Sequence, residues 1–386
     1  MTNANSQTSR VPQRVELNDF KLPIVISNDS DYLDNLESKL TSFLGDIRNF
    51  QNLGEEIFGR TQQNVNKILE AIKSYYDADT SAARRLIFDM LELYKDNTFI
   101  VSNLDDSPAF RGISRLRLPT DTPQPTVRHP MVNHPLSFFK ARIGTEAFGK
   151  RDFLHIPFNK RGIVSTQRFS IAGVPCMYFG ATSYVSWLEL GKPADNEFNV
   201  SSYEVPNETK VLNLTITQQL INGLSAFGDQ LSEEVASLIE IFPLIIATSY
   251  KVRENGRSFK SEYIVSQLVM QCLPLLEAEG VAYISKRVDN DSANFPVCVN
   301  LAIPMKNSSD NYSDFANQIP LTHPINYAEF KKMSIRHFQD ERRASFASVI
   351  EQGISYLGRP MQYQNHEFCE FDNYLVSEQH SSVSGR

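Results

Sequence analysis

The sequence predicts a mixed α+β protein, in which a helical N-terminal region is followed by a mixed α/β domain. Three observations support this prediction. Between residues 31 and 95, apolar side chains recur at steps of three and four, as they do on the buried face of a helix. From about residue 174, short apolar runs typical of strands alternate with helical segments. Between the two regions, six prolines fall within residues 108–135, which is typical of a loop.

The N-terminal region is expected to be a small helical bundle. Residues 1–30 are polar, and we expect them to be mobile. Leu33, Leu36 and Leu40 begin a helical pattern that continues through residues 57–72 and 82–94. No acid–base pair or cluster of metal ligands stands out in residues 31–105, so the sequence assigns no chemistry to this bundle.

The second region, residues 106–320, is expected to hold the functional domain. Its central unit is a strand over 174–179 and a short helix over 182–190, with Thr182 or Ser183 as the N-cap. A longer helix over 261–279 is expected to kink at Pro274 and to end at Gly280. Residues 321–386 are expected to form a helical extension with a polar tail. The other predicted elements are strands at 211–215, 281–285 and 297–303, and helices at 233–247, 327–338 and 341–354.

Composition argues against several classes of protein. The chain has 386 residues and a formal net charge of -7, and it lacks the basic stripe of a nucleic-acid-binding protein. Its four cysteines show no CxxC spacing, so we expect neither a disulfide framework nor a metal site. The N-terminal residues lack the apolar segment of a signal peptide, and the most apolar run, residues 238–247, is too short to span a membrane. These features predict a cytoplasmic protein.

Several common catalytic motifs are absent. The sequence contains no HExxH and no GxSxG, which argues against zinc proteases and against hydrolases with a serine nucleophile. Residues 144–150 approach a phosphate-binding loop, but Arg151 stands where the Ser or Thr that binds magnesium is required. Chemistry must therefore come from another arrangement.

Residues 153–190 contain a candidate arrangement of catalytic residues. Arg161 and Arg168 precede a Gly-x-Pro turn, a buried strand carries Tyr178, and Glu189 follows Arg168 by twenty-one residues. One strand–turn–helix unit of that length can bring an arginine and a glutamate to the same end of a strand. The guanidinium suits phosphate, the carboxylate can stabilise positive charge on a ribose, and the aromatic ring can stack on a base.

These residues resemble the core of the RES-domain family, which is named for an arginine, a glutamate and a serine. The resemblance covers residues 110–303 and rests on the order of several short pieces. The pieces are Arg111-Gly-Ile-Ser-Arg115-Leu-Arg117, then Gln167-Arg168-Phe169-Ser170, Gly173-Val-Pro-Cys-Met-Tyr178, Glu189, and Gly280-Val-Ala-Tyr-Ile-Ser285.

The resemblance implies an ADP-ribosyltransferase-like fold that consumes NAD as a substrate. The reaction would be cleavage of the nicotinamide–ribose bond by phosphate or by water, without a resident cofactor, as the toxin of a toxin–antitoxin pair. Arg168, Glu189 and Ser285 would be catalytic. Glu189 would stabilise the transition state, Arg115 and Arg168 would hold phosphate groups, and Tyr178 would orient the nicotinamide ribose. The partners implied are NAD, inorganic phosphate and an antitoxin protein.

Alternatives remain at several positions. Arg111 or Arg117 could take the place of Arg115, and Ser266 is a rival for Ser285. Arg161 and His155 are further candidates for substrate binding, although a lone histidine between apolar neighbours is more often a core residue.

The function also has alternatives. One is ADP-ribose transfer to a macromolecule, and the other is a non-catalytic protein that binds NAD or ADP-ribose. A homo-oligomer is compatible with each of these functions.

Overall fold

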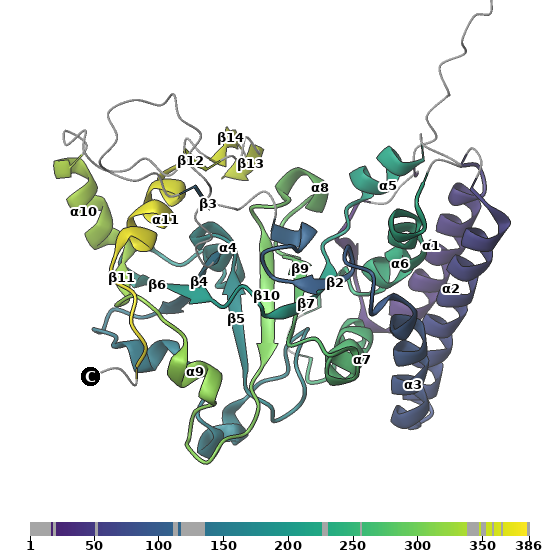
Figure 1. Ribbon diagram of the computed structural model, residues 1–386, viewed down its shortest axis with the longest axis horizontal. Coiled ribbons are helices and arrows are strands. Elements are labelled where there is room, and N and C mark those ends of the chain that lie inside the picture. The colour runs from purple at the N-terminus through teal and green to yellow at the C-terminus, as the bar shows by residue number, and fades with distance from the viewer. Residues whose placement is uncertain are drawn as a thin grey trace, which may run out of the picture.

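The computed structural model describes residue 17 and residues 21–50, 53–110, 115–116, 136–225, 231–254, 257–337, 347–348, 353–356, 359–363 and 366–383. Helices form one end of the molecule, a sheet forms its centre, and further helices cover the other end (Figure 1). The predicted mixed α+β class is confirmed. No described helix is long and apolar enough to cross a membrane.

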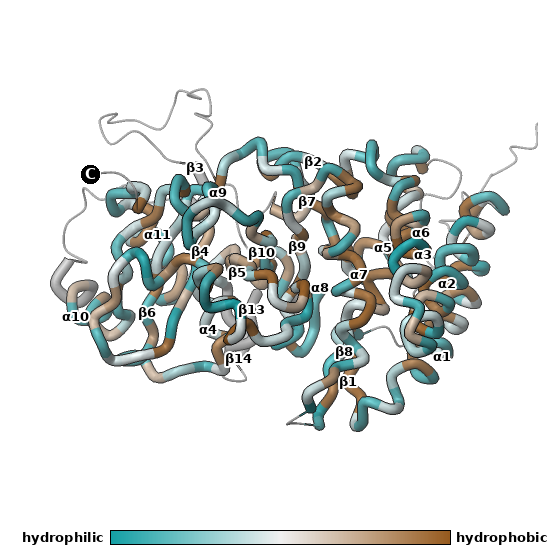
Figure 2. Tube along the Cα trace, turned by 90° about the horizontal axis from the view of Figure 1, so that it is seen from below, coloured by the Kyte–Doolittle hydropathy of each residue, from teal (hydrophilic) through white to brown (hydrophobic). Residues whose placement is uncertain are grey.

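After a short strand and a 3-10 turn, three antiparallel helices follow in the described chain, as the apolar periodicity predicts. Their boundaries lie within a few residues of the predicted ones, and each buries one apolar stripe. Two helices from the second half of the sequence pack against them and complete this part of the core. These two helices lie between the outer helices and the sheet, and many of their residues are hydrophobic (Figure 2). The five helices are α1 (Tyr32–Ile47), α2 (Glu55–Tyr76), α3 (Thr80–Leu91), α6 (Glu233–Ala247) and α7 (Ile264–Cys272).

An eight-stranded sheet forms the centre of the molecule. Its strand order is β11-β6-β4-β5-β10-β9-β7-β2, and every neighbouring pair is antiparallel except β7 and β9. Side chains alternate between the two faces with the period of a strand. The strands are β2 (Val101–Asn103), β4 (Leu136–Ile143), β5 (Cys176–Gly180), β6 (Phe198–Val205), β7 (Lys210–Leu214), β9 (Gly280–Ile284), β10 (Val299–Pro304) and β11 (Ile325–Asn326).

The alternation divides the protein into two cores. In β9, Val281 and Tyr283 belong to the core shared with the helical end, whereas Ala282 and Ile284 belong to the core on the opposite face. β5 behaves in the same way, since Tyr178 packs toward the helical end and Phe179 toward the other side. Polar residues on the first face of these strands therefore point toward the helical end.

A short parallel strand pair ties the N-terminal segment to the sheet region. β1 (Ile24–Ile26) pairs with β8 (Tyr250–Val252), so part of the segment expected to be mobile forms regular structure. The next residues form a 3-10 turn, in which Asp29 accepts hydrogen bonds from the backbone N–H and the hydroxyl of Ser261 at 2.9 and 2.7 Å.

The helix predicted over 261–279 is shorter in the structure. α7 ends at Cys272, a 3-10 turn follows over Leu273–Leu276, and Glu277 takes the left-handed conformation with φ 55°. Pro274 has no N–H to continue the helix. Gly280 is not the C-cap but the first residue of β9, where a Cβ would lie 2.9 Å from the carbonyl oxygen of Ala302. Because Gly280 has no side chain, β10 can approach β9 closely at this position.

The C-terminal extension differs from its prediction. The helix expected over 341–354 is wrong for the described residues: Ala347–Ser348 is strand β12, and Gly353–Tyr356 is strand β13. β13 forms a hairpin with β14 (Arg359–Gln362), because strand pairing satisfies the backbone groups that a helix would have used. The expected polar tail contains helix α11 (Glu367–Ser377), which buries Phe368, Phe371 and Leu375. α10 (Tyr327–His337) agrees with its prediction.

Candidate active site

Helix α4 (Ser183–Glu189) leaves the end of β5 and carries Glu189 at its last position. Thr182 caps it, since its hydroxyl oxygen accepts a 3.1 Å hydrogen bond from the backbone N–H of Val185. The helix lies very close to β5: a Cβ on Gly180 would be 2.5 Å from Val185 and 2.7 Å from Ser186. The strand, the glycine and the cap together fix where Glu189 projects.

The Glu189 carboxylate is held from two strands. The hydroxyl of Ser285, directly after β9, donates to Oε1 at 2.7 Å, and the side-chain amide of Asn300 on β10 donates to the same oxygen at 2.7 Å. Arg287 lies 3.9 Å from Oε2. Both hydrogen-bond donors are buried, whereas the Glu189 side chain is 38% exposed. One face of the acid is therefore anchored, and the other is open to a ligand.

Arg168 is anchored by backbone oxygens and not by a carboxylate. Its guanidinium donates to the carbonyl oxygens of Thr248 at 2.9 Å and Tyr250 at 2.6 Å, and it lies 4.9 Å from the ring centre of Tyr263. A guanidinium has five N–H groups, so these two hydrogen bonds leave others for a ligand. The charge of Arg168 has no carboxylate within salt-bridge distance among the described residues.

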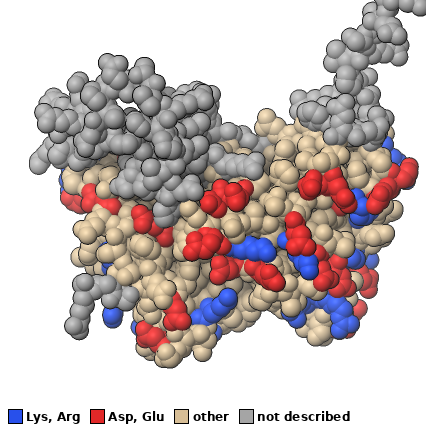
Figure 3. Space-filling view, viewed as in Figure 1, with Lys and Arg blue, Asp and Glu red and all other residues tan. Residues whose placement is uncertain are grey.

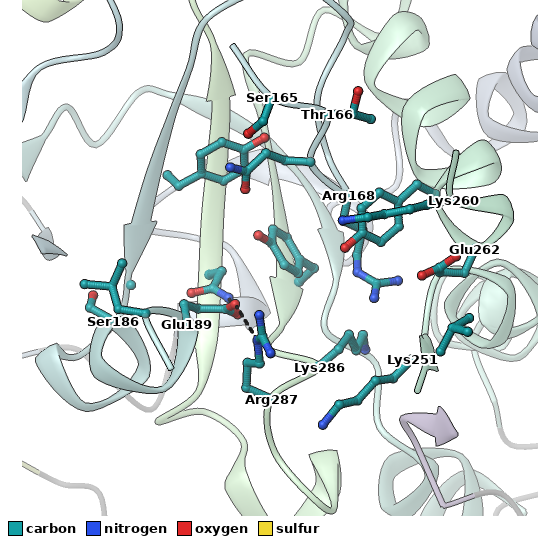
Figure 4. A pocket seen from close by; sticks show the side chains of 18 of the residues that line it. Ser165, Thr166, Arg168, Ser186, Glu189, Lys251, Lys260, Glu262, Lys286 and Arg287 are labelled. Atoms are coloured by element: carbon teal, nitrogen blue, oxygen red, sulfur yellow. Dashed lines mark hydrogen bonds and ion pairs between the residues drawn. The ribbon is translucent and has the colours of Figure 1, made fainter. Parts of the chain in front are cut away.

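Arg168 and Glu189 line one cavity of about 880 Å³. Figure 4 shows Glu189 on the side of α4 and Arg168 across the cavity from it. Tyr178 and Tyr283 also line the cavity; burial raises the pKa of each hydroxyl well above its usual value, so both stay protonated. Tyr178 donates its proton to the carbonyl oxygen of Phe169 at 2.7 Å. The cavity has the size of sites for small organic ligands, and it offers aromatic surfaces beside charged groups.

The cavity is basic although the chain is acidic. Eight of its lining residues are Lys or Arg and three are Glu, whereas the whole chain has a formal net charge of -7. On the described part of the face in Figure 3, acidic and basic side chains are intermingled over the helical end and the centre. The concentration of positive charge inside one cavity favours an anionic ligand.

Not every residue that the sequence suggests is brought to this cavity. Arg161 donates to the carbonyl oxygen of Gly173 at 2.9 Å and to Asn307 at 3.0 Å, which places it outside the cavity lining. His155 is buried, and burial lowers its pKa. Its Nε2 accepts from the backbone N–H of Ser313 at 3.0 Å, so Nδ1 donates to the carbonyl oxygen of Ile156 at 2.8 Å. It lines a neighbouring cavity of about 630 Å³.

The two residues for which alternatives were open have different outcomes. Ser285 contacts Glu189, whereas the rival Ser266 lies buried in α7 and does not line the cavity. Arg115 lies in β3 (Arg115–Leu116), which pairs with β12 in a separate two-stranded sheet. This strand does not belong to the eight-stranded sheet, in which the eight-residue β4 lies beside β5. The side chain of Arg115, and residues 111 and 117, lie outside the described residues.

Sequence reasoning missed four residues of the site. Asn300 is a polar residue within an otherwise apolar strand, and that contrast is a signal that could have found it. Lys286 directly follows Ser285, and Lys251 comes from β8. Lys140 on β4 lines both cavities and donates to the carbonyl oxygens of Phe153 and Leu154; burial lowers its pKa to about 7. No local pattern distinguishes the three lysines from surface lysines.

Comparison with known proteins gives one informative similarity. No protein-family model matches the chain, and no solved structure matches it. A protein of Bacillus subtilis (strain 168) named "Putative toxin YopC" is 34% identical to this chain over 188 residues. The aligned part covers 46% of this chain and 42% of that protein, so the chain spans less than half the length of the relative that it matches.

Proposed function

We propose that this protein cleaves the nicotinamide–ribose bond of NAD, with phosphate or water as the acceptor, and that it acts as a toxin restrained by a partner protein. The observation that carries the proposal is the shared cavity of Arg168 and Glu189. A dinucleotide needs cations for its diphosphate, a flat surface for its bases and an acid beside the ribose. The cavity has residues of all three types.

The chemistry follows from the charges that develop in the reaction. When the bond from ribose C1′ to the ring nitrogen breaks, the electron pair goes to the nitrogen, and nicotinamide leaves as a neutral molecule. Positive charge then develops on the ribose, and the anchored carboxylate of Glu189 can stabilise it. An oxygen of phosphate or water forms the new bond to C1′, and a water acceptor also releases one proton to solvent. Arg168 would hold the diphosphate, so positioning contributes to the rate.

The similarity to a protein whose name contains the word toxin supports the biological part of the proposal. The enzymatic part is supported by the geometry and by the resemblance to the RES-domain family. Both parts predict the same behaviour in a bacterial host: production of the wild-type protein stops growth, and production of Glu189→Gln does not. Restored growth with the variant at equal protein level supports the proposal. Equal toxicity of both proteins contradicts it.

The direct test uses purified protein and NAD, with free nicotinamide measured by chromatography. Arg168→Ala and Glu189→Gln should each lower the rate by at least about 100-fold, the scale reported for loss of one transition-state contact. Glu92→Gln, an exposed glutamate after α3, is the matched control and should retain full activity. NAD labelled in its adenosine part separates the alternatives, because label on a macromolecule would indicate transfer and not degradation. Full activity in both cavity variants would refute the assignment.

A further inference from the structure

Three cations form a group on the side of the cavity opposite α4. They are Arg168, Lys251 and Lys286, and Figure 4 shows them across the cavity from Glu189. Lys286 is 8% exposed, and its ammonium donates to the hydroxyl of Ser249 at 2.7 Å. Arg168 is anchored by the carbonyl oxygens of Thr248 and Tyr250. Lys251 belongs to β8, and the other two cations bind residues 248–250 at the end of α6 and the start of β8, so one short stretch of chain places all three.

None of the three cations forms an ion pair within the described part of the chain. The acids that line the cavity are engaged elsewhere. Glu189 is bound by Ser285 and Asn300, with Arg287 near its other oxygen. Glu262 and Glu254 both face Arg257, with closest nitrogen–oxygen distances of 2.8 and 4.0 Å.

A buried charge without a counter-ion is unfavourable, and proteins usually pair it or neutralise it. For Lys286 the cost is large, because the side chain is nearly inaccessible to water. Its neighbours act in opposite directions: Asp291 and Glu189 favour the charged ammonium, and Arg168 opposes it. An anion that enters the cavity would supply the missing counter-charge to Lys286, Arg168 and Lys251 together.

We propose that Arg168, Lys251 and Lys286 form an oxyanion subsite that takes a phosphate group. The proposal deepens the function given above and rests on it for the source of the phosphate. In a dinucleotide, the diphosphate lies one ribose away from the nicotinamide bond. A subsite across the cavity from Glu189 suits that spacing, and the chemistry would equally admit free phosphate.

The subsite has a measurable signature, because the lysine changes its protonation when it gains a counter-ion. In the empty cavity, burial lowers the pKa of Lys286 to about 7. A bound phosphate favours the charged form and raises that pKa. Binding at pH values above about 7 therefore takes up a proton, whereas binding at a pH well below about 7 takes up almost none, since Lys286 is already charged.

The experiment is calorimetric titration of the full-length protein with ADP-ribose and, separately, with inorganic phosphate. Each titration is run at about pH 6 and about pH 8.5, in buffers of different ionisation enthalpy, which gives the number of protons taken up. We expect uptake approaching one proton at the higher pH with either ligand, and nearly none at the lower pH with ADP-ribose, whose diphosphate does not titrate in this range. Inorganic phosphate itself titrates at about pH 7, so its uptake is interpreted only at the higher pH, where it is already the dianion. Uptake with ADP-ribose places the dinucleotide's diphosphate in the subsite, and uptake with phosphate alone places the acceptor there.

Variants make the assignment specific. Lys286→Met should abolish the uptake and weaken binding at about pH 6 by about tenfold or more, the scale for loss of a hydrogen bond to a charged group. Lys251→Met should weaken binding and retain the uptake. Lys73→Met, an exposed lysine on α2, is the matched control and should change neither.

Two outcomes overturn the subsite: wild-type affinity in Lys286→Met for both ligands, or no proton uptake with either ligand at the higher pH. The NAD assay is independent of both. If ADP-ribose binds with uptake that depends on Lys286 while NAD is never cleaved, the subsite stands and the proposed function fails.

Discussion

At the scale of single residues, the site depends on how one carboxylate is held. Glu189 is at the end of a seven-residue helix and would rotate freely if it were unsupported. Ser285 and Asn300 both donate to Oε1, which fixes the rotamer, while Oε2 lies 3.9 Å from Arg287. These two donors come from neighbouring strands, so the sheet orients the acid that α4 carries.

We expect the loss of either donor to affect the chemical step more than substrate binding. Ser285→Ala and Asn300→Ala should each lower kcat for NAD cleavage by about 10- to 100-fold, since a hydrogen bond to a charged group contributes about 1.5–3 kcal/mol. KM should change little, because neither side chain belongs to the proposed phosphate subsite. Steady-state kinetics of both single variants and the double variant measure this. A rise in KM with unchanged kcat would argue against the positioning role.

Lys286 allows a prediction about stability. Its pKa is lowered to about 7 in the folded protein, whereas the unfolded chain has the ordinary value of about 10.5. Between these values the unfolded state binds more protons, so this group makes the free energy of unfolding rise with pH. Below about pH 7 Lys286 is charged in both states, and the full cost of burying its charge lowers the free energy of unfolding.

Lys286→Met should therefore stabilise the empty protein by about 1–3 kcal/mol near pH 6, on a scale of about 1.4 kcal/mol for each unit of pKa shift. The gain should shrink as the pH rises toward 10. Urea unfolding at several pH values, with Lys73→Met as the control, measures the difference. A variant less stable than the wild type at pH 6 would contradict the account.

At the scale of elements, the β5–α4 unit places the acid, and its sequence could be read in advance. The apolar run, the cap at Thr182 and the glycine beyond Leu190 all agree with one local structure. β6 was missed because its buried residues include Asn199, Ser201 and Ser202, which hide the apolar pattern of a strand. The strands at 347–348 and 353–356 were mistaken for a helix because pairing partners are not visible in a local sequence.

Substitution of Gly180 tests whether the close packing of α4 on β5 positions Glu189. In Gly180→Ala the new Cβ would meet Val185 and Ser186 at 2.5 and 2.7 Å and the backbone oxygen of Thr182 at 2.8 Å. We expect α4 to shift, with a loss of about 1–3 kcal/mol of stability and of most NAD cleavage. Gly45→Ala is the matched control: its Cβ meets nothing within 4 Å, and alanine in a helix should be stabilising by about 0.5–1 kcal/mol. Thermal unfolding measures the stability of both variants, and the nicotinamide assay measures their activity. Full activity of Gly180→Ala would show that the close packing does not position Glu189.

At the scale of the whole molecule, the helical end and the sheet share one core. Residues of α1, α2 and α3 belong to the same hydrophobic cluster as Leu212 and Leu214 of β7 and Val281 of β9. Within the helical end, a polar network joins the helices, since Glu240 of α6 binds Arg60 of α2 at 2.7 Å and accepts from the hydroxyl of Tyr94 at 2.9 Å. Asp29 holds the loop that begins at Arg257.

This shared core explains which site residues the sequence could reveal. Arg168 and Glu189 belong to one local unit, and Ser285 ends a predicted strand, so pattern and order were sufficient to suggest them. Lys251 and Lys286 reach the cavity only because the segment after α6 is held between the helical end and the sheet. That arrangement depends on contacts between residues more than 200 positions apart, such as Asp29 and Ser261, which no local pattern contains.

A fragment comprising residues 106–386 should therefore not fold alone. Removing α1–α3 would expose the apolar faces of α6 and α7 and release β8 from β1. We expect an aggregated or unfolded fragment without cooperative thermal unfolding, as measured by circular dichroism and size-exclusion chromatography beside the full chain. A monomeric fragment that unfolds cooperatively and binds ADP-ribose like the full chain would contradict this view of the molecule.

The most direct test of the central claim is the amount of free nicotinamide released when purified full-length protein is mixed with NAD. We expect one nicotinamide for each NAD consumed, at a rate that added phosphate accelerates or leaves unchanged, and a release at least about 100-fold slower with Glu189→Gln at equal stability, the cost of one transition-state contact. Intact NAD after prolonged incubation with folded wild-type protein, with and without phosphate, would contradict it.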